Sequence, residues 1–112
     1  MIYIRSASEI DKISKACQIV KETLEMLKEW VKPGISTLEL DNKAEEFIYS
    51  KGAEPGFKGL YGYPATLCVS IDDEVVHGLP TNRKLQEGEI LSVDVGSLMD
   101  GFYGDHAKSF SV

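Results

Sequence analysis

The sequence has 112 residues, 43% of them hydrophobic, which suffices for one compact domain with a buried core but leaves no room for two ordinary domains. A formal net charge of −6 and an isoelectric point near 4.8, without any basic run, argue against a nucleic-acid partner. Two cysteines, Cys17 and Cys68, are too few for a disulfide framework and indicate a reducing compartment. Charged residues occur within the first few positions, which argues against a secretory signal and against a membrane span. We therefore expect a cytoplasmic protein.

Two amphipathic helices are predicted in the first half of the chain. The first begins with capping-box spacing at Ser6 and Glu9, and its apolar residues recur every three or four positions until the Pro-Gly pair at 33–34 ends it. The second is predicted to begin at Ser36, to carry one apolar side, and to end at residues 51–52. We expect the two helices to form an antiparallel pair, and the apolar face of each to pack against another part of the protein.

Strands are predicted in the second half. Residues 53–64 (AEPGFKGLYGYP) indicate a glycine-rich aromatic loop, and residues 65–71 indicate a strand. After a polar connection, residues 89–98 and 101–112 are predicted to form a β-hairpin. Helices followed by strands predict an α+β fold, with both helices on one face of an antiparallel sheet and residues 1–112 as a single domain. The sequence stops inside a predicted strand, so we expect either a genuine edge strand or a missing continuation.

Two aspartates, Asp94 and Asp105, lie in the predicted hairpin, although strands are depleted in aspartate and like charges across a ladder repel each other. A turn at residues 99–100 would set them directly opposite, whereas a turn at residues 100–101 would make them diagonal neighbours. Both registers place the two carboxylates on the same face, because side chains alternate with a period of two. Gly96 is expected to leave open space beside Asp94.

A divalent metal ion between the two carboxylates would remove the repulsion. Hard oxygen ligands on a rigid hairpin suit Mn²⁺, Fe²⁺, Co²⁺, Zn²⁺ or Mg²⁺, and two donors do not select among these ions. In the alternative interpretation, one aspartate lies at a bulge and both point into solvent. The spacing of Asp94 and Asp105 alone favours neither interpretation.

Several segments together resemble the N-terminal half of bacterial-type (type I) methionine aminopeptidases. These segments are KPGISTLEL, YGYPATLCVSIDDEVVHGLP and EGEILSVDVGSLMDGFYGDHAKSF, and the resemblance covers essentially all 112 residues. It implies a pita-bread fold, in which two similar α+β halves related by a pseudo-twofold axis enclose a two-metal site. It also implies hydrolytic removal of the N-terminal methionine from peptides. The chain would then be one half pita-bread domain, with the C-terminal half absent.

The resemblance also implies roles for individual residues. Asp94 and Asp105 match the two metal-ligating aspartates of the first half. His77 matches a catalytic histidine that contacts the substrate near the scissile bond, whereas without the family it would more often be a surface histidine. Tyr63 and Cys68 match positions that line the pocket for the methionine side chain, whereas by residue type they would more often be plain core.

The chain departs from the family pattern in what it lacks. The family's remaining ligands, one histidine and two glutamates, belong to the second half, so we expect the isolated monomer to be inactive or nearly so. We expect the inner sheet face to be a large apolar patch, which a homodimer could bury. The same homodimer would bring Asp94 and Asp105 of two copies to one centre. The alternatives are a non-catalytic binding or structural module and a truncated, reconstructed or engineered fragment. His106 replaces a small or hydroxyl residue of the relatives and is predicted on the face opposite Asp105.

Overall fold

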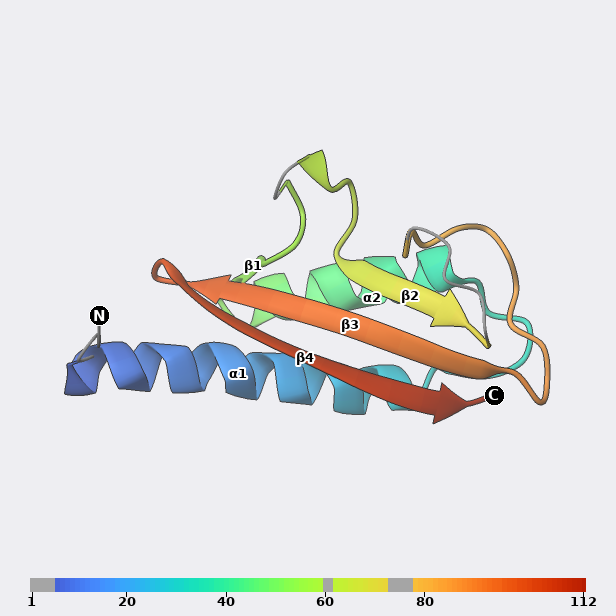
Figure 1. Ribbon diagram of the computed structural model, residues 1–112, viewed down its shortest axis with the longest axis horizontal. Helices are drawn as coiled ribbons and strands as arrows, with labels where there is room; N and C mark the ends of the chain where they lie inside the picture. The colour runs from blue at the N-terminus through green and yellow to red at the C-terminus, as the bar shows by residue number, and fades with distance from the viewer. Residues whose placement is uncertain (1–5, 60–61, 73–77) are drawn as a thin grey trace.

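A computed structural model of the chain describes residues 6–59, 62–72 and 78–112. Helices α1 (Ala7–Lys28) and α2 (Thr37–Ser50) run in opposite directions and cover one face of a four-stranded antiparallel sheet (Figure 1). Within the described residues, the other face of the sheet, which we call the open face, carries no helix. The predicted α+β arrangement with two helices on one sheet face is therefore confirmed.

The sheet is built around its longest hairpin. Strand β3 (Ile90–Met99) pairs on one side with β4 (Phe102–Ser111). On its other side, β3 pairs with β2 (Leu67–Ile71) and with the short strand β1 (Glu54–Pro55). The sequence did not predict β1, which forms where the aromatic loop begins. β4 is an edge strand, because no described strand pairs with its second side.

The hairpin turn lies at Asp100 and Gly101. Their φ angles of 50° and 85° are left-handed, as a two-residue hairpin turn requires. Met99 pairs with Phe102, and the pairing continues in constant register, without a bulge, as far as Ile90 and Ser111. Of the two predicted turn positions, residues 100–101 therefore set the register.

The hydrophobic core lies between the helices and the sheet. Every second residue of β3, namely Leu91, Val93 and Val95, is buried on the helix side, while the helices contribute residues spaced three or four apart. The buried apolar residues of the helices and strands are Ile19, Val20, Leu24, Leu27, Leu40, Ala44, Ile48, Leu67, Val69, Ile71, Leu91, Val93, Val95 and Phe110.

Both helices begin at their predicted caps. The Ser6 hydroxyl accepts from the Glu9 N–H at 3.1 Å, and the Glu9 carboxylate accepts from the Ser6 N–H at 3.1 Å. Ser36 caps α2 through the N–H three residues later, also at 3.1 Å. The predicted end of the first helix at residues 33–34 was wrong, because α1 ends at Lys28. Helical geometry is disfavoured for the residue before a proline, so the chain leaves the helix before Pro33.

α1 approaches the hairpin closely at two small residues. Gly104 pairs with Ser97, and the buried Ser97 hydroxyl donates to the Ala16 carbonyl at 2.7 Å. A Cβ added at Gly104 would lie 2.6 Å from the Cys17 backbone nitrogen and 2.7 Å from the Ala16 carbonyl carbon. Only glycine fits between β4 and the helix backbone, so this contact sets how α1 lies on the sheet.

A buried carboxylate joins α2 to the start of β2. Asp41 is 6% exposed, and its Oδ1 accepts from the backbone N–H of Thr66 at 2.9 Å and of Leu67 at 2.7 Å. Burial is the largest influence and raises the pKa of Asp41, although the two N–H donors act in the opposite direction.

Replacing Gly104 with alanine should destabilise the fold by about 1–3 kcal/mol, because the new methyl group meets the backbone of α1. Urea unfolding measures the change. Ala107→Ser is the matched control, since it adds one atom to the same strand at an exposed position and should change stability by less than about 0.5 kcal/mol. An unchanged midpoint for Gly104→Ala would show that α1 is free to shift.

Asp41→Ala should destabilise the fold by about 1–3 kcal/mol for each buried N–H left without an acceptor, whereas Asp41→Asn keeps the acceptor oxygen. A raised pKa means that the folded state holds the Asp41 proton more tightly than the unfolded state. This stabilisation is fully present below the unfolded pKa of about 3.9 and is lost as pH rises through the folded pKa.

The unfolding free energy of the wild type should therefore increase relative to that of Asp41→Asn as pH is lowered from 7 towards 4. Urea titrations of both proteins at several pH values measure this difference. A wild type that loses stability relative to Asp41→Asn on acidification would contradict the assignment.

Candidate metal and substrate site

Asp94 and Asp105 lie on the open face of the sheet. Asp94 pairs with Ala107 and Asp105 pairs with Gly96, so the two aspartates are diagonal neighbours across the β3–β4 ladder. Both side chains are exposed. The predicted same-face, diagonal arrangement is present, and no bulge separates the two carboxylates.

Neither carboxylate has a cationic partner within the described residues, where the ion pairs involve other acids. Two negative charges on one rigid ladder repel each other, and a divalent cation would neutralise both. The donor chemistry therefore fits a hard or borderline metal ion. Among the residues that the structure describes, no group of three or more potential ligands occurs, and those residues offer two carboxylates at this place.

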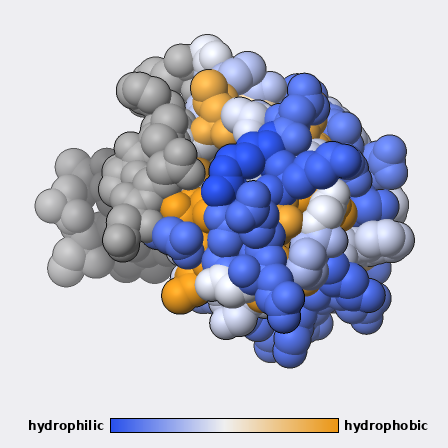
Figure 2. Space-filling model, turned by 90° about the vertical axis from the view of Figure 1, so that its right-hand side faces the viewer, coloured by the Kyte–Doolittle hydropathy of each residue, from blue (hydrophilic) through white to orange (hydrophobic). Residues whose placement is uncertain are grey.

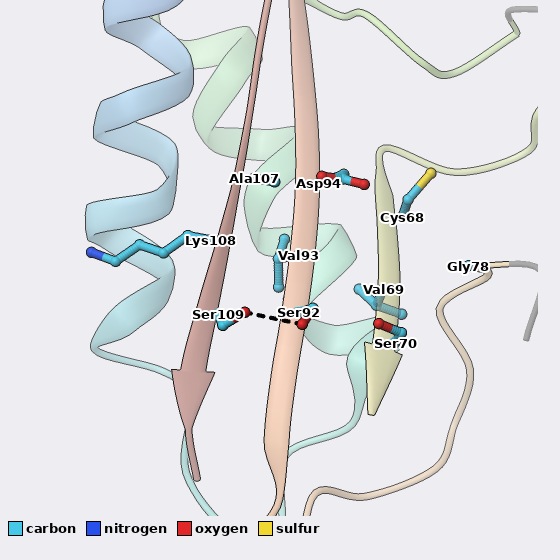
Figure 3. A pocket seen from close by; sticks show the side chains of 10 residues that line it. All are labelled: Cys68, Val69, Ser70, Gly78, Ser92, Val93, Asp94, Ala107, Lys108 and Ser109. Atoms are coloured by element: carbon cyan, nitrogen blue, oxygen red, sulfur yellow. Dashed lines mark hydrogen bonds between the residues drawn. The ribbon is translucent and has the colours of Figure 1, made fainter. Parts of the chain in front are cut away.

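A cavity of about 460 Å³ opens beside Asp94 (Figure 3). Cys68 is the direct cross-strand partner of Asp94, and both residues line the cavity. The next row of the sheet consists of Ser70, Ser92 and Ser109, and the hydroxyl oxygens of Ser92 and Ser109 are 3.1 Å apart. The cavity is therefore lined by mostly small residues, among them three serines beside Asp94.

The space above Gly96 is filled, which corrects the prediction that it is open. The Gly56 N–H donates to the Gly96 carbonyl at 2.8 Å and holds the loop after β1 against β3. A Cβ added at Gly96 would lie 2.9 Å from Cε1 of Phe57. The half-buried Phe57 ring therefore borders the carboxylate pair. Its place in the aromatic loop was visible in the sequence, but its packing against β3 was not.

The Tyr63 hydroxyl holds the backbone around Cys68. It lies 2.6 Å from the carbonyl oxygen of Leu67 and 2.9 Å from that of Gly78, and its single proton can be donated to either. The Gly78 carbonyl also accepts from the Val69 N–H at 2.8 Å. Burial, followed by the neighbouring Cys68 thiol, raises the pKa of Tyr63, which keeps the hydroxyl a neutral donor.

His106 and Cys17 lie apart from this cavity. His106 pairs with Val95 on the helix side of β4, on the face opposite Asp105 as predicted, and lines a groove of about 510 Å³ with Cys17 and Lys21 of α1. His77 lies outside the described residues. The structure thus brings together Asp94, Asp105 and Cys68, with Tyr63 behind Cys68.

The open face is not the large apolar patch that the sequence analysis predicted. In its described part the centre carries aspartates, serines, Cys68 and Ala107, while the large exposed apolar residues Ile90 and Tyr103 lie at the two ends. The alternation along β3 directs its valines and Leu91 to the helices instead. Figure 2 shows that the right-hand end of the molecule is mostly hydrophilic, with apolar residues in separate small areas. Within the described chain, neither helix has the length and hydropathy of a membrane-spanning segment.

Comparison with known proteins places this chain in a family. The sequence matches metallopeptidase family M24 over residues 11–112. The methionine aminopeptidase of Clostridium perfringens is 51% identical over 112 residues, covering 100% of this chain and 45% of the relative. Methionine aminopeptidase 1 of Bacillus subtilis is 45% identical with the same coverage. The chain therefore spans about half the length of these relatives.

Solved structures agree with the sequence matches. Methionine aminopeptidase from Thermotoga maritima superposes with a TM-score of 0.94 at 40% identity, and the Rickettsia prowazekii enzyme with 0.94 at 34%. Each match covers 100% of this chain and 45% of the other. Prolidase from Pyrococcus horikoshii shares only the fold, with a TM-score of 0.84 at 23% identity. These neighbours have the pita-bread fold, of which this chain matches about half, and the chain belongs to metallopeptidase family M24.

Proposed function

We propose that this chain supplies two metal ligands, Asp94 and Asp105, to a divalent-metal-dependent aminopeptidase that removes N-terminal methionine from peptides. The observation that carries the proposal is the pair of carboxylates on one sheet face without a cationic partner among the described residues. The names of the high-identity relatives, methionine aminopeptidases, support the substrate class. The proposed metal is Co²⁺, Mn²⁺, Fe²⁺, Zn²⁺ or Mg²⁺.

The remaining candidate residues have proposed roles around this pair. A bound metal would polarise the peptide carbonyl and activate water for hydrolysis. Cys68, beside Asp94 in the cavity, and the ring of Tyr63 would line the pocket for the methionine side chain. The Tyr63 hydroxyl would position Gly78 and β2 rather than bind substrate, because it already contacts two carbonyl groups. His77 would hydrogen-bond the substrate or the tetrahedral intermediate.

The isolated chain is proposed to be inactive or weakly active, because two carboxylates are few for a dinuclear site. We propose that it works in the cytoplasm, as residues 1–112 of one half pita-bread domain, and forms a metal-binding homodimer that mimics the complete fold. The second candidate is a non-catalytic binding module that keeps the fold without the chemistry. The cavity beside Asp94 and Cys68 is compatible with such a module, and metal binding distinguishes the two candidates.

Calorimetric titration with Co²⁺, Mn²⁺ and Zn²⁺ tests the metal site. We expect one ion per chain for the wild type, and at least a tenfold weaker affinity for Asp94→Asn and for Asp105→Asn, because each change removes an anionic ligand. Asp100→Asn is the matched control, since it removes the same charge from the turn of the same hairpin and keeps a residue that tolerates left-handed φ.

The opposite result supports the non-catalytic module. If Asp94→Asn and Asp105→Asn together increase the unfolding free energy by relieving repulsion, and leave the calorimetric response to metal unchanged, the two aspartates are not ligands.

Tyr63→Phe should accelerate hydrogen exchange at the Val69 amide and destabilise the fold by about 0.5–1.5 kcal/mol, because the hydroxyl no longer helps to hold Gly78 against β2. Exchange is measured by NMR. Tyr103→Phe is the matched control, since Tyr103 is 54% exposed at the end of the open face. Equal Val69 exchange rates in the wild type and Tyr63→Phe would contradict the positioning role.

A further inference from the structure

An aromatic ring next to the candidate site takes its position from a short stretch of loop. The Phe57 ring packs on Gly96. Gly96 is the direct ladder partner of Asp105, and Asp94 lies two residues before it on the same face of β3. The place of this ring therefore decides how much space and how much water the two carboxylates have on the side of the aromatic loop.

Backbone hydrogen bonds fix only one side of Phe57 to the sheet. Before the ring, the Gly56 N–H donates to the Gly96 carbonyl at 2.8 Å, and a Cβ added at Gly56 would lie 2.9 Å from the Gly96 carbonyl carbon. After the ring, the Gly59 N–H donates to the Tyr63 carbonyl at 2.7 Å. This second bond joins two residues of the same loop, so it does not fix the loop relative to the sheet or the helices.

Lys58 joins the other side of the stretch to α2. Its ammonium group pairs with the Glu45 carboxylate, and Asp41, one turn earlier on α2, also attracts it. The hydrogen bond to Glu45 is the largest influence on the pKa of Lys58 and raises it, so the ammonium group stays charged. Because Asp41 also holds Thr66 and Leu67, α2 contacts the chain both within the aromatic loop and just after it.

The ion pair is suited to a local effect. The side chains of Lys58 and Glu45 are 44% and 22% exposed, and ion pairs with this degree of exposure contribute little to global stability. A weak contact can still fix a loop, because loops open locally at a much smaller cost than that of global unfolding. With Gly56 held on β3 and Lys58 held on α2, both chain neighbours of Phe57 are fixed.

We infer that Lys58 is a positioning residue of the candidate site, because its ion pair with Glu45 holds the Phe57 ring beside the two carboxylates. The inference deepens the proposed function and rests on it. Lys58 acts through the ring, since its own ammonium group pairs with α2. The ring covers one side of the carboxylate pair, and charges interact more strongly where water is excluded.

NMR spectroscopy of the chain tests this role. The Gly96 α-protons report the position of the ring, because an aromatic ring shifts the resonances of protons packed against it. In Lys58→Met, which keeps an unbranched stem and removes the charge, these shifts should move towards random-coil values. The Gly56 amide should exchange about threefold faster. Glu45→Gln should have the same effects, and the double variant should add nothing, because each change removes the same pair.

Two variants and one set of amides serve as controls. Lys58→Arg keeps the positive charge and should restore the wild-type Gly96 shifts. Lys15→Met removes an exposed ion pair with Asp11 on α1 and should leave the loop signals unchanged. Exchange at the core amides of β3 should change by less than about twofold in Lys58→Met, which separates a local effect from a loss of global stability.

The outcomes separate this inference from the proposed function. Gly96 shifts and Gly56 exchange that are the same in Lys58→Met as in the wild type overturn the inference. If calorimetry then still shows Mn²⁺ binding that depends on Asp94 and Asp105, the proposed function stands without it. Changed shifts in Lys58→Met, combined with no calorimetric binding of Mn²⁺ by the wild type, support the hold of Lys58 on the ring and contradict the proposed function instead.

Discussion

The register of the β3–β4 hairpin is the constraint on which the rest of this structure depends. Asp100 and Gly101 adopt the left-handed φ angles of a two-residue turn, and from there the strands pair in constant register to their ends. A slip of one residue in either strand would exchange its two faces. The observed register sends Leu91, Val93 and Val95 to the helices and leaves Asp94 and Asp105 together on the open face.

Close packing of α1 holds this hairpin in place. Gly104 and Ser97 bring the β-ladder within contact distance of the helix backbone, where a larger residue than glycine has no room. Because α1 covers one face of the hairpin, the carboxylates of Asp94 and Asp105 lie on the other, open face. The result is a face whose described centre is polar and negatively charged, which suits a cation better than apolar contact with another protein.

Polar anchors place the loops around the candidate site. Asp41 connects α2 to the start of β2, the Gly56 N–H connects the aromatic loop to β3, and the Tyr63 hydroxyl connects Leu67 to Gly78. Each anchor contacts backbone groups at Gly96 or at Leu67, the residue before Cys68. The membership of family M24 gives this arrangement a chemical context, since its relatives are metallopeptidases.

Local rules in the sequence were enough to determine both helix caps, a tight hairpin turn within residues 99–101, the α+β layering and the shared face of Asp94 and Asp105. These features depend on neighbours a few residues apart, on hydrogen bonds close in sequence and on the two-residue period of a strand. Only the tertiary structure decided that Phe57 covers Gly96, that Tyr63 uses its hydroxyl on the backbone and that the open face is polar at its centre. Such contacts join segments distant in the chain, and their geometry follows from how the helices, loops and sheet pack together, which local periodicity does not encode.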